Sequence, residues 1–149
     1  MTAYRLVERD FDSFFRVPFV QYGHASTYVS PFRADLVVLL VGRRNPTFPA
    51  HALTYFTVLD GTTPVGRLTA HIHRASNERY GQRAGSFGYF DCGDDAEAAR
   101  LLFGAASEWL ANRGCDEISG NFNLTAMQEM GVVVDGHDRD PFLAQHHNP

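Results

Sequence analysis

The spacing of hydrophobic residues predicts one long amphipathic helix in the second half of the chain. Residues 95–113 have apolar side chains at spacings of three and one, which places them on one helical face: Ala99, Leu102, Phe103, Ala106, Trp109 and Leu110. Asp94, with Glu97 three residues later, resembles a capping box at the start of this helix. Arg113 followed by Gly114 is a suitable stop.

Three strand-like segments precede that helix. Residues 52–59 and 65–74 are separated by the turn sequence Asp-Gly-Thr-Thr-Pro, so we expect a β-hairpin. A loop that contains Asn77 and Gly81 leads to a third expected strand, residues 85–91, which is rich in Phe and Tyr. The three strands are expected to form a consecutive antiparallel set.

The helix is followed by a short strand-like segment, residues 115–119. Strand, helix and strand make a βαβ unit, so residues 85–91 and 115–119 should be parallel neighbours with a right-handed crossover. Near the N-terminus we expect a strand at 3–7 and then a helix that Asp10 or Asp12 caps and that Pro18 disturbs or ends. Two further helices are expected at 31–44 and 125–130, and a further strand at 132–134.

These elements predict an α/β fold with a mixed, mostly antiparallel sheet, helices on both faces and one parallel crossover. The chain has 149 residues, which fits one domain over residues 1–149. Hydrophobic residues make up 44% and charged residues 20%, as in an ordinary soluble protein. We therefore expect a single folded unit with one sizeable core.

Charge and composition exclude several classes of function. The net charge is -4 and the pI about 5.9, so no basic surplus is available for nucleic acid. No apolar run reaches the roughly 20 residues that span a bilayer, and the N-terminus does not resemble a signal peptide, so a cytoplasmic location without membrane contact is expected. All 13 basic residues are Arg, which excludes Lys bases and Schiff-base chemistry. Two cysteines are too few for a zinc ribbon or a disulfide framework.

The order of elements resembles that of the GNAT superfamily of acyl-CoA-dependent N-acyltransferases. The sequence is similar to an uncharacterised bacterial branch of it over roughly residues 2–149, in the segments 43–48, 61–72, 85–90, 120–124, 134–136 and 147–149. Relatives in this branch typically continue past the final Asn-Pro, so the resemblance implies a chain shortened at its C-terminus. A partner chain that completes the site, as in a homodimer, is left open.

The resemblance implies that an acyl-CoA lies in a gap where strands 86–91 and 115–119 diverge, with its pyrophosphate at the start of the long helix. The cofactor-binding candidates are then Phe90, Asp91, Cys92, Gly93, Asp95 and Ala96. The family loop usually carries a basic or polar residue and spaced glycines, whereas this loop has three carboxylates and one glycine. Each exposed carboxylate would repel pyrophosphate by about 1 kcal/mol or less in water. A compensating Arg, a different ligand and a vestigial pocket are the three alternatives.

Two histidines lie two positions apart on an expected strand, and so on one face. We interpret His71 as a candidate acid–base residue and His73 as a substrate contact; a hydrogen-bonded structural role is the alternative for both. A metal site that adds His51 would need further ligands that the sequence does not indicate, so no metal is assigned.

The segment after the crossover carries polar side chains near the expected gap. Asn121 is a candidate substrate contact, and Asn123 is a candidate catalytic residue that could orient an amide or an acyl carbonyl; turn formation is the alternative for both. Glu129 is a candidate general base, unless it is a solvated helix residue. Tyr89 is a candidate substrate contact on the strand that would line the gap.

The favoured hypothesis is an enzyme that transfers an acyl group from an acyl-CoA, or another acyl thioester, to a small amine. The alternative is a GNAT-fold protein that does not use CoA and binds or converts a small metabolite in the same gap. A metal-dependent enzyme that uses His71 and His73 is the third. The first two depend on the divergence of the two parallel strands.

Overall fold

The computed structural model describes residues 4–23, 28–41, 45, 47–49, 51–125, 130–131, 134–136 and 139. Its elements in chain order are β1 (Tyr4–Glu8), α1 (Phe11–Tyr22), α2 (Arg33–Leu40), β2 (Leu53–Asp60), β3 (Thr63–His71), α3 (Arg74–Tyr80), β4 (Ala84–Cys92), α4 (Ala96–Ala111) and β5 (Glu117–Ser119). The expected hairpin, third strand, long helix and following strand are therefore confirmed.

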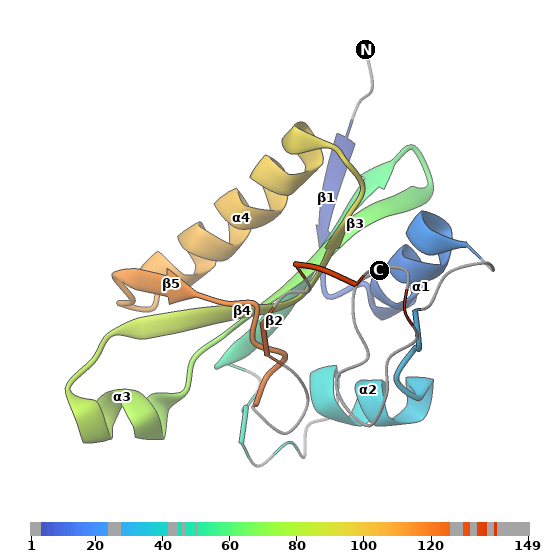
Figure 1. The fold of residues 1–149 in the computed structure, drawn as a ribbon. Helices are drawn as coiled ribbons and strands as arrows, with labels where there is room; N and C mark the ends of the chain where they lie inside the picture. Colours follow the sequence, from blue (N-terminus) through green and yellow to red (C-terminus); the bar gives the residue numbers. More distant parts are fainter. Residues whose placement is uncertain are drawn as a thin grey trace.

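The strands form one five-stranded sheet in the order β1-β2-β3-β4-β5. The first four pair antiparallel, and β4 pairs with β5 in parallel. The mixed sheet and its single parallel pair confirm the expected fold class. Figure 1 shows α4 running beside the sheet, on the side away from α1 and α2.

Each face of the sheet has its own hydrophobic core. Under α4, Leu102 and Leu110 pack with Leu68 and Ala70 of β3. Under α1 and α2, one cluster contains Phe14, Leu36, Leu40, Leu53, Tyr55, Tyr89 and Leu124. Successive residues of a strand point to opposite faces, so β3 supplies Leu68 and Ala70 to one face and polar residues to the other.

Helix α4 starts one residue later than the capping box implied. The observed N-cap is Asp95, whose side chain accepts hydrogen bonds from the backbone N–H groups of Glu97 and Ala98. The expectation for Asp94 was wrong because an N-cap side chain reaches the second and third residues after it, and the helix begins at Ala96.

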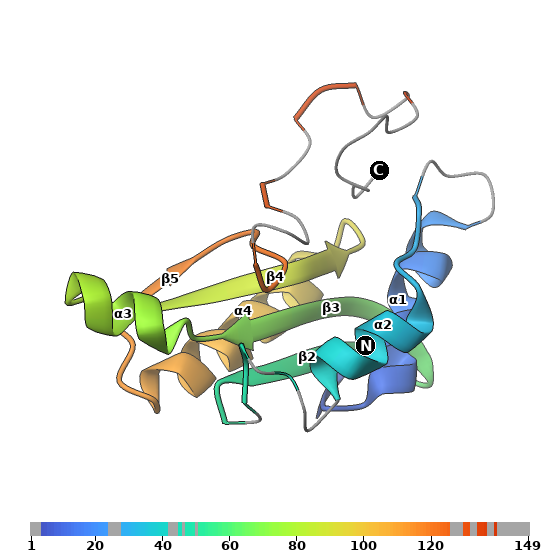
Figure 2. The same cartoon turned by 90° about the horizontal axis from the view of Figure 1, so that it is seen from below.

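Two helices differ from expectation. Helix α1 is capped by Asp10 and continues through Pro18 to Tyr22, so Pro18 does not end the helix but does interrupt its hydrogen bonding. Proline has no N–H for the carbonyl of Phe14, and Arg67 Nη1 donates to that oxygen instead at 3.4 Å. Helix α3 lies where a loop was expected; Gly81 ends it in a left-handed conformation with φ 63°. Figure 2 shows α3 at the end of the sheet remote from α1.

Helix α2 is shorter than the expected 31–44, and residues 42–44 lie outside the described part of the chain. So do residues 126–129, 132–133 and 140–149, which hold most of the helix expected at 125–130 and of the strand expected at 132–134. Among the described residues, no helix is long and apolar enough to cross a bilayer.

Candidate functional site

Strands β4 and β5 are regularly paired only over a short distance. Their register is Ala84↔Glu117, Gly85↔Ile118 and Ser86↔Ser119, after which β4 continues to Cys92 and β5 has ended. Beyond that point two single contacts join the segments: Phe122 N donates to Phe87 O at 2.8 Å, and Tyr89 N donates to Asn123 Oδ1 at 2.5 Å. Regular pairing therefore stops after the first three of the nine residues of β4.

A bulge in β4 lies at the same level. Arg67 pairs with Asp91 and Thr69 with Gly88, so the register shifts by one residue at Tyr89, whose φ is 47°. The two aromatic side chains of this bulge point to opposite faces. The ring of Tyr89 packs against Phe14 under α1 (centroids 6.3 Å apart), and Phe90 packs against Phe103 of α4 (4.9 Å).

The segment Phe122–Leu124 lies across β4 and joins groups that are distant in sequence. An added Cβ on Gly88 would lie 2.1 Å from Phe122 O, so only glycine permits this close approach. Leu124 O is 2.6 Å from Nε2 of His73. A carbonyl oxygen only accepts, so Nε2 carries the proton, and the neutral ring then has its lone pair on Nδ1.

His71 lies behind His73 and is completely buried. Its ring contacts Phe48 (5.1 Å between centroids), His73 (5.6 Å) and Phe122 (6.3 Å), and neither of its nitrogens has a hydrogen-bond partner among the described residues. Burial, with a smaller contribution from His73, lowers the pKa of His71 to about 3. The ring is therefore neutral near pH 7 and does not reach solvent.

A cavity of about 790 Å³ opens beside the segment Phe122–Leu124. His73 and Asn121 line it, together with Ser86 and Ser119 of the last paired position. No Asp, Glu or Arg is among its described lining residues. Asn121 is 8% exposed; its Nδ2 donates to Gly131 O at 3.4 Å, and its Oδ1 has no partner among the described residues. The site thus presents uncharged donors and acceptors.

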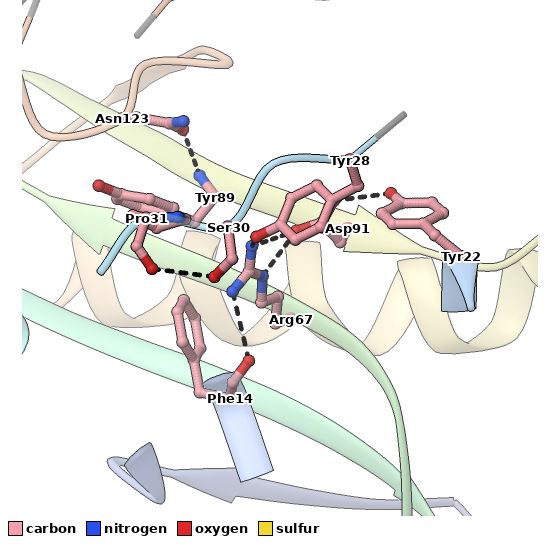
Figure 3. A network of polar contacts seen from close by, with 9 residues as sticks. All are labelled: Phe14, Tyr22, Tyr28, Ser30, Pro31, Arg67, Tyr89, Asp91 and Asn123. Atoms are coloured by element: carbon pink, nitrogen blue, oxygen red, sulfur yellow. Dashed lines mark hydrogen bonds and ion pairs between the residues drawn. The ribbon is translucent and has the colours of Figure 1, made fainter. Parts of the chain in front are cut away.

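A buried ion pair at the far end of β4 was not anticipated from the sequence. Arg67 Nε donates to Asp91 Oδ2 at 2.6 Å, and Tyr22 Oη donates to Asp91 Oδ1 at 2.7 Å (Figure 3). Tyr28 Oη and Phe14 O accept further hydrogen bonds from the guanidinium. Burial, the largest single effect, lowers the pKa of Arg67, but the charge of Asp91, the Tyr28 hydroxyl and the hydrogen bonds to both together outweigh it and raise the pKa.

This pair accounts for one of the three carboxylates of the 91–95 loop. Asp91 faces α1 rather than a ligand, because Arg67 neutralises it inside the fold. An Arg inside the strand-like segment Val65–Ile72 was the available signal, since a buried charge needs a partner. Cys92 is half-buried, and burial followed by Asp95 and Asp91 raises the pKa of its thiol to about 11.

The remaining candidates are distributed as follows. Asn123 belongs to the segment after β5 and accepts a hydrogen bond from Tyr89 N, His73 contacts that segment at Leu124 O, and Asn121 lines the cavity beside it. Asp95 and Ala96 begin α4. Glu129 lies outside the described residues. Over the described part of the chain, no three His, Cys, Asp or Glu side chains converge as ligands for a metal ion.

Comparison with curated proteins finds two long relatives. The chain is 43% identical over 83 residues to Protein YghO of Escherichia coli (strain K12), which is 56% of this chain and 21% of that protein. It is 31% identical over 123 residues to the bacterial ceramide synthase of Caulobacter vibrioides, which is 82% of this chain and 32% of that protein. The chain thus spans about a fifth and a third of their lengths. No family model matches the chain.

Three solved structures with a similar fold are acetyltransferases. The aminoglycoside acetyltransferase meta-AAC0020, in complex with sisomicin, has a TM-score of 0.55 and 13% identity, over 78% of this chain and 75% of that one. AAC(6')-Iy, with a bisubstrate analogue that contains CoA, has a TM-score of 0.53 and 14% identity over 78% of each chain. A GNAT-family acetyltransferase from Staphylococcus aureus Mu50 has a TM-score of 0.51 and 9% identity, over 78% and 71%. The chain therefore has the fold of the GNAT acetyltransferases.

Proposed function

We propose that this protein forms an amide by transferring an acyl group from a thioester to an amine. The amine nitrogen attacks the acyl carbon, the carbon–sulfur bond breaks, and the thiol leaves with the proton that the amine loses. The fold and the names of the solved neighbours support acyl transfer in general. The observation that carries the proposal is the segment Phe122–Leu124, which contacts both a backbone donor and a histidine.

The backbone donor is the N–H of Tyr89. The bulge takes this group out of the regular ladder, at the level where β5 has already ended. An oriented N–H in a buried setting can stabilise the negative charge that develops on an acyl oxygen during attack. In the structure this N–H donates to Asn123 Oδ1, a carbonyl oxygen of the same kind as that of a thioester. The acyl oxygen would replace the oxygen of Asn123.

The proton acceptor in the proposal is His73 rather than His71. His71 has no exposed surface, and burial lowers its pKa to about 3, so it is a poor base for a substrate in the cavity. His73 lines the cavity, and its hydrogen bond to Leu124 O leaves Nδ1 as the acceptor nitrogen. General bases are commonly histidines whose second ring nitrogen donates to an oxygen, which keeps the ring in one tautomer.

The uncharged cavity is the proposed amine site. Ser86, Ser119 and Asn121 can hydrogen-bond an uncharged polar substrate there, and the absence of carboxylates from its described lining disfavours a retained ammonium charge. The Caulobacter relative is named as a ceramide synthase, and a ceramide is an amide of a long-chain amino alcohol. A long-chain amino alcohol is therefore the first amine to test.

The test measures thiol release and amide formation with acetyl and palmitoyl thioesters and a panel of amines. We expect amide product by mass spectrometry, and about a 100-fold or larger loss of kcat for His73→Asn, which removes the acceptor nitrogen. The control is His51→Asn, which removes an exposed imidazole that does not line the cavity. No product with any donor and amine, or full activity in His73→Asn, would contradict the proposal.

A further inference from the structure

The start of α4 is already bound to a carboxylate of the same chain. Asp95 Oδ1 accepts from Glu97 N and Ala98 N, both at 2.9 Å. The hydroxyl of Tyr4 on β1 donates to Oδ2 of the same carboxylate. A helix start attracts an anion through such unpaired N–H groups. Here two of those groups have an anionic partner from within the fold.

The loop before α4 is closed to a phosphate group on a second side. An added Cβ on Gly93 would lie 2.7 Å from Gln21 Oε1, so the side chain of Gln21 covers this glycine. Gln21 is held there by a hydrogen bond from Nε2 to Val65 O at 2.9 Å. Close approach of a phosphate to the backbone, for which such loops use glycine, is therefore obstructed.

The charges around the loop are also unfavourable. Asp94 is exposed beside Asp95 and adds a second carboxylate at the surface. Among the described residues Arg67 is the only buried Arg, and it is already paired with Asp91. A pyrophosphate at this position would meet two carboxylates, and the guanidinium would have to leave a buried partner to reach it. These residues do not fit the pyrophosphate of CoA.

We propose that this protein recognises its acyl donor through the acyl-pantetheine arm and does not bind the nucleotide pyrophosphate at the start of α4. This inference rests on the proposed acyl transfer and narrows its donor to the class of S-acyl pantetheine thioesters, whatever group the arm carries at its other end. The arm is an uncharged amide chain. The backbone of β4 beyond Tyr89, past its contacts with Phe122 and Asn123, is the surface that such a chain can contact.

The first experiment compares acetyl-CoA with S-acetylpantetheine as donors for the same amine. We expect kcat/KM values within about threefold of each other, because the nucleotide adds no contact. Adenosine 3',5'-bisphosphate and pyrophosphate should not inhibit. A preference for acetyl-CoA of about tenfold or more would overturn the inference.

The second experiment needs no activity. The backbone amides of Glu97 and Ala98 are followed by ¹⁵N NMR during titration with pyrophosphate. We expect no shift in the wild-type protein and a saturable shift in Asp95→Gly, which frees both N–H groups and is among the mildest replacements at an N-cap. Asp94→Asn is the matched control, since it removes a neighbouring charge but leaves the cap intact. Asp95→Asn is the second variant if Asp95→Gly does not fold, and a weaker shift than in Asp95→Gly is expected because the Asn side chain still caps the helix without carrying a charge.

The two experiments separate this inference from the proposed function. A saturable wild-type shift at Glu97 and Ala98 overturns the inference, whether or not the protein transfers an acyl group. No wild-type shift together with use of neither donor supports a closed pyrophosphate site and rejects acyl transfer. No wild-type shift with equal use of both donors supports both.

Discussion

Burial of His71 makes the stability of this protein depend on pH in a way that one substitution can isolate. The folded-state pKa of about 3 lies below the unperturbed value of 6.5, because the ring is enclosed by Phe48, His73 and Phe122. Below about pH 6.5 the unfolded chain binds a proton at this residue and the folded chain does not. The contribution of the neutral His71 ring to the free energy of unfolding is therefore fully present above about pH 6.5 and is lost as the pH falls toward 3.

The size of the effect follows from the shift. Each pH unit below 6.5 costs about 1.4 kcal/mol, so the loss is on the order of 2 kcal/mol at about pH 5. His71→Leu removes the titrating ring and keeps an apolar side chain of similar volume. Both ring nitrogens lack partners among the described residues, so the variant should be as stable as the wild type near pH 7, or more stable by about 1 kcal/mol.

The assay is urea denaturation of both proteins at about pH 7.5 and about pH 5, with the free energy of unfolding extrapolated to water. Carboxylates titrate in both proteins, so the change in the difference between them isolates His71. We expect the variant to gain on the order of 2 kcal/mol relative to the wild type at the lower pH. His51→Leu, which removes an exposed imidazole, is the control. A change of less than about 0.5 kcal/mol would refute the reasoning.

Two other contacts carry predictions. Asn123→Ala removes the oxygen that accepts from the N–H of Tyr89, so a thioester should bind about three- to tenfold more tightly to the variant by isothermal calorimetry. Unchanged or weaker binding would argue against an acyl oxygen at that N–H. Asp91→Asn leaves the guanidinium of Arg67 buried without a counter-charge and should cost about 3–5 kcal/mol of unfolding free energy, whereas the double variant Arg67→Met/Asp91→Leu should recover most of it. Denaturation of all three proteins tests this, and equal stability of the double and single variants would contradict it.

Much of the fold could be predicted from local patterns. The helix at residues 95–113 and the strands before it follow from the spacing of apolar residues, and the turn follows from the residue types at 60–64. None of these signals depends on a residue far away in sequence. The βαβ rule then made β4 and β5 parallel neighbours, as their register confirms. Asp94 and Asp95 can both cap a helix, and the sequence analysis placed the N-cap of α4 one residue too early.

The candidate site depended on contacts between residues far apart in sequence. The pairing of Arg67 with Asp91 and the hydrogen bond between His73 and Leu124 involve separations of 24 and 51 residues. The sequence by itself determined the hairpin, the long helix and the abundance of carboxylates before it, because periodicity, turn chemistry and capping act within a few residues. Only the tertiary structure decided which histidine is buried and which carboxylates are neutralised. Burial and charge pairing depend on which faces the folded sheet brings together.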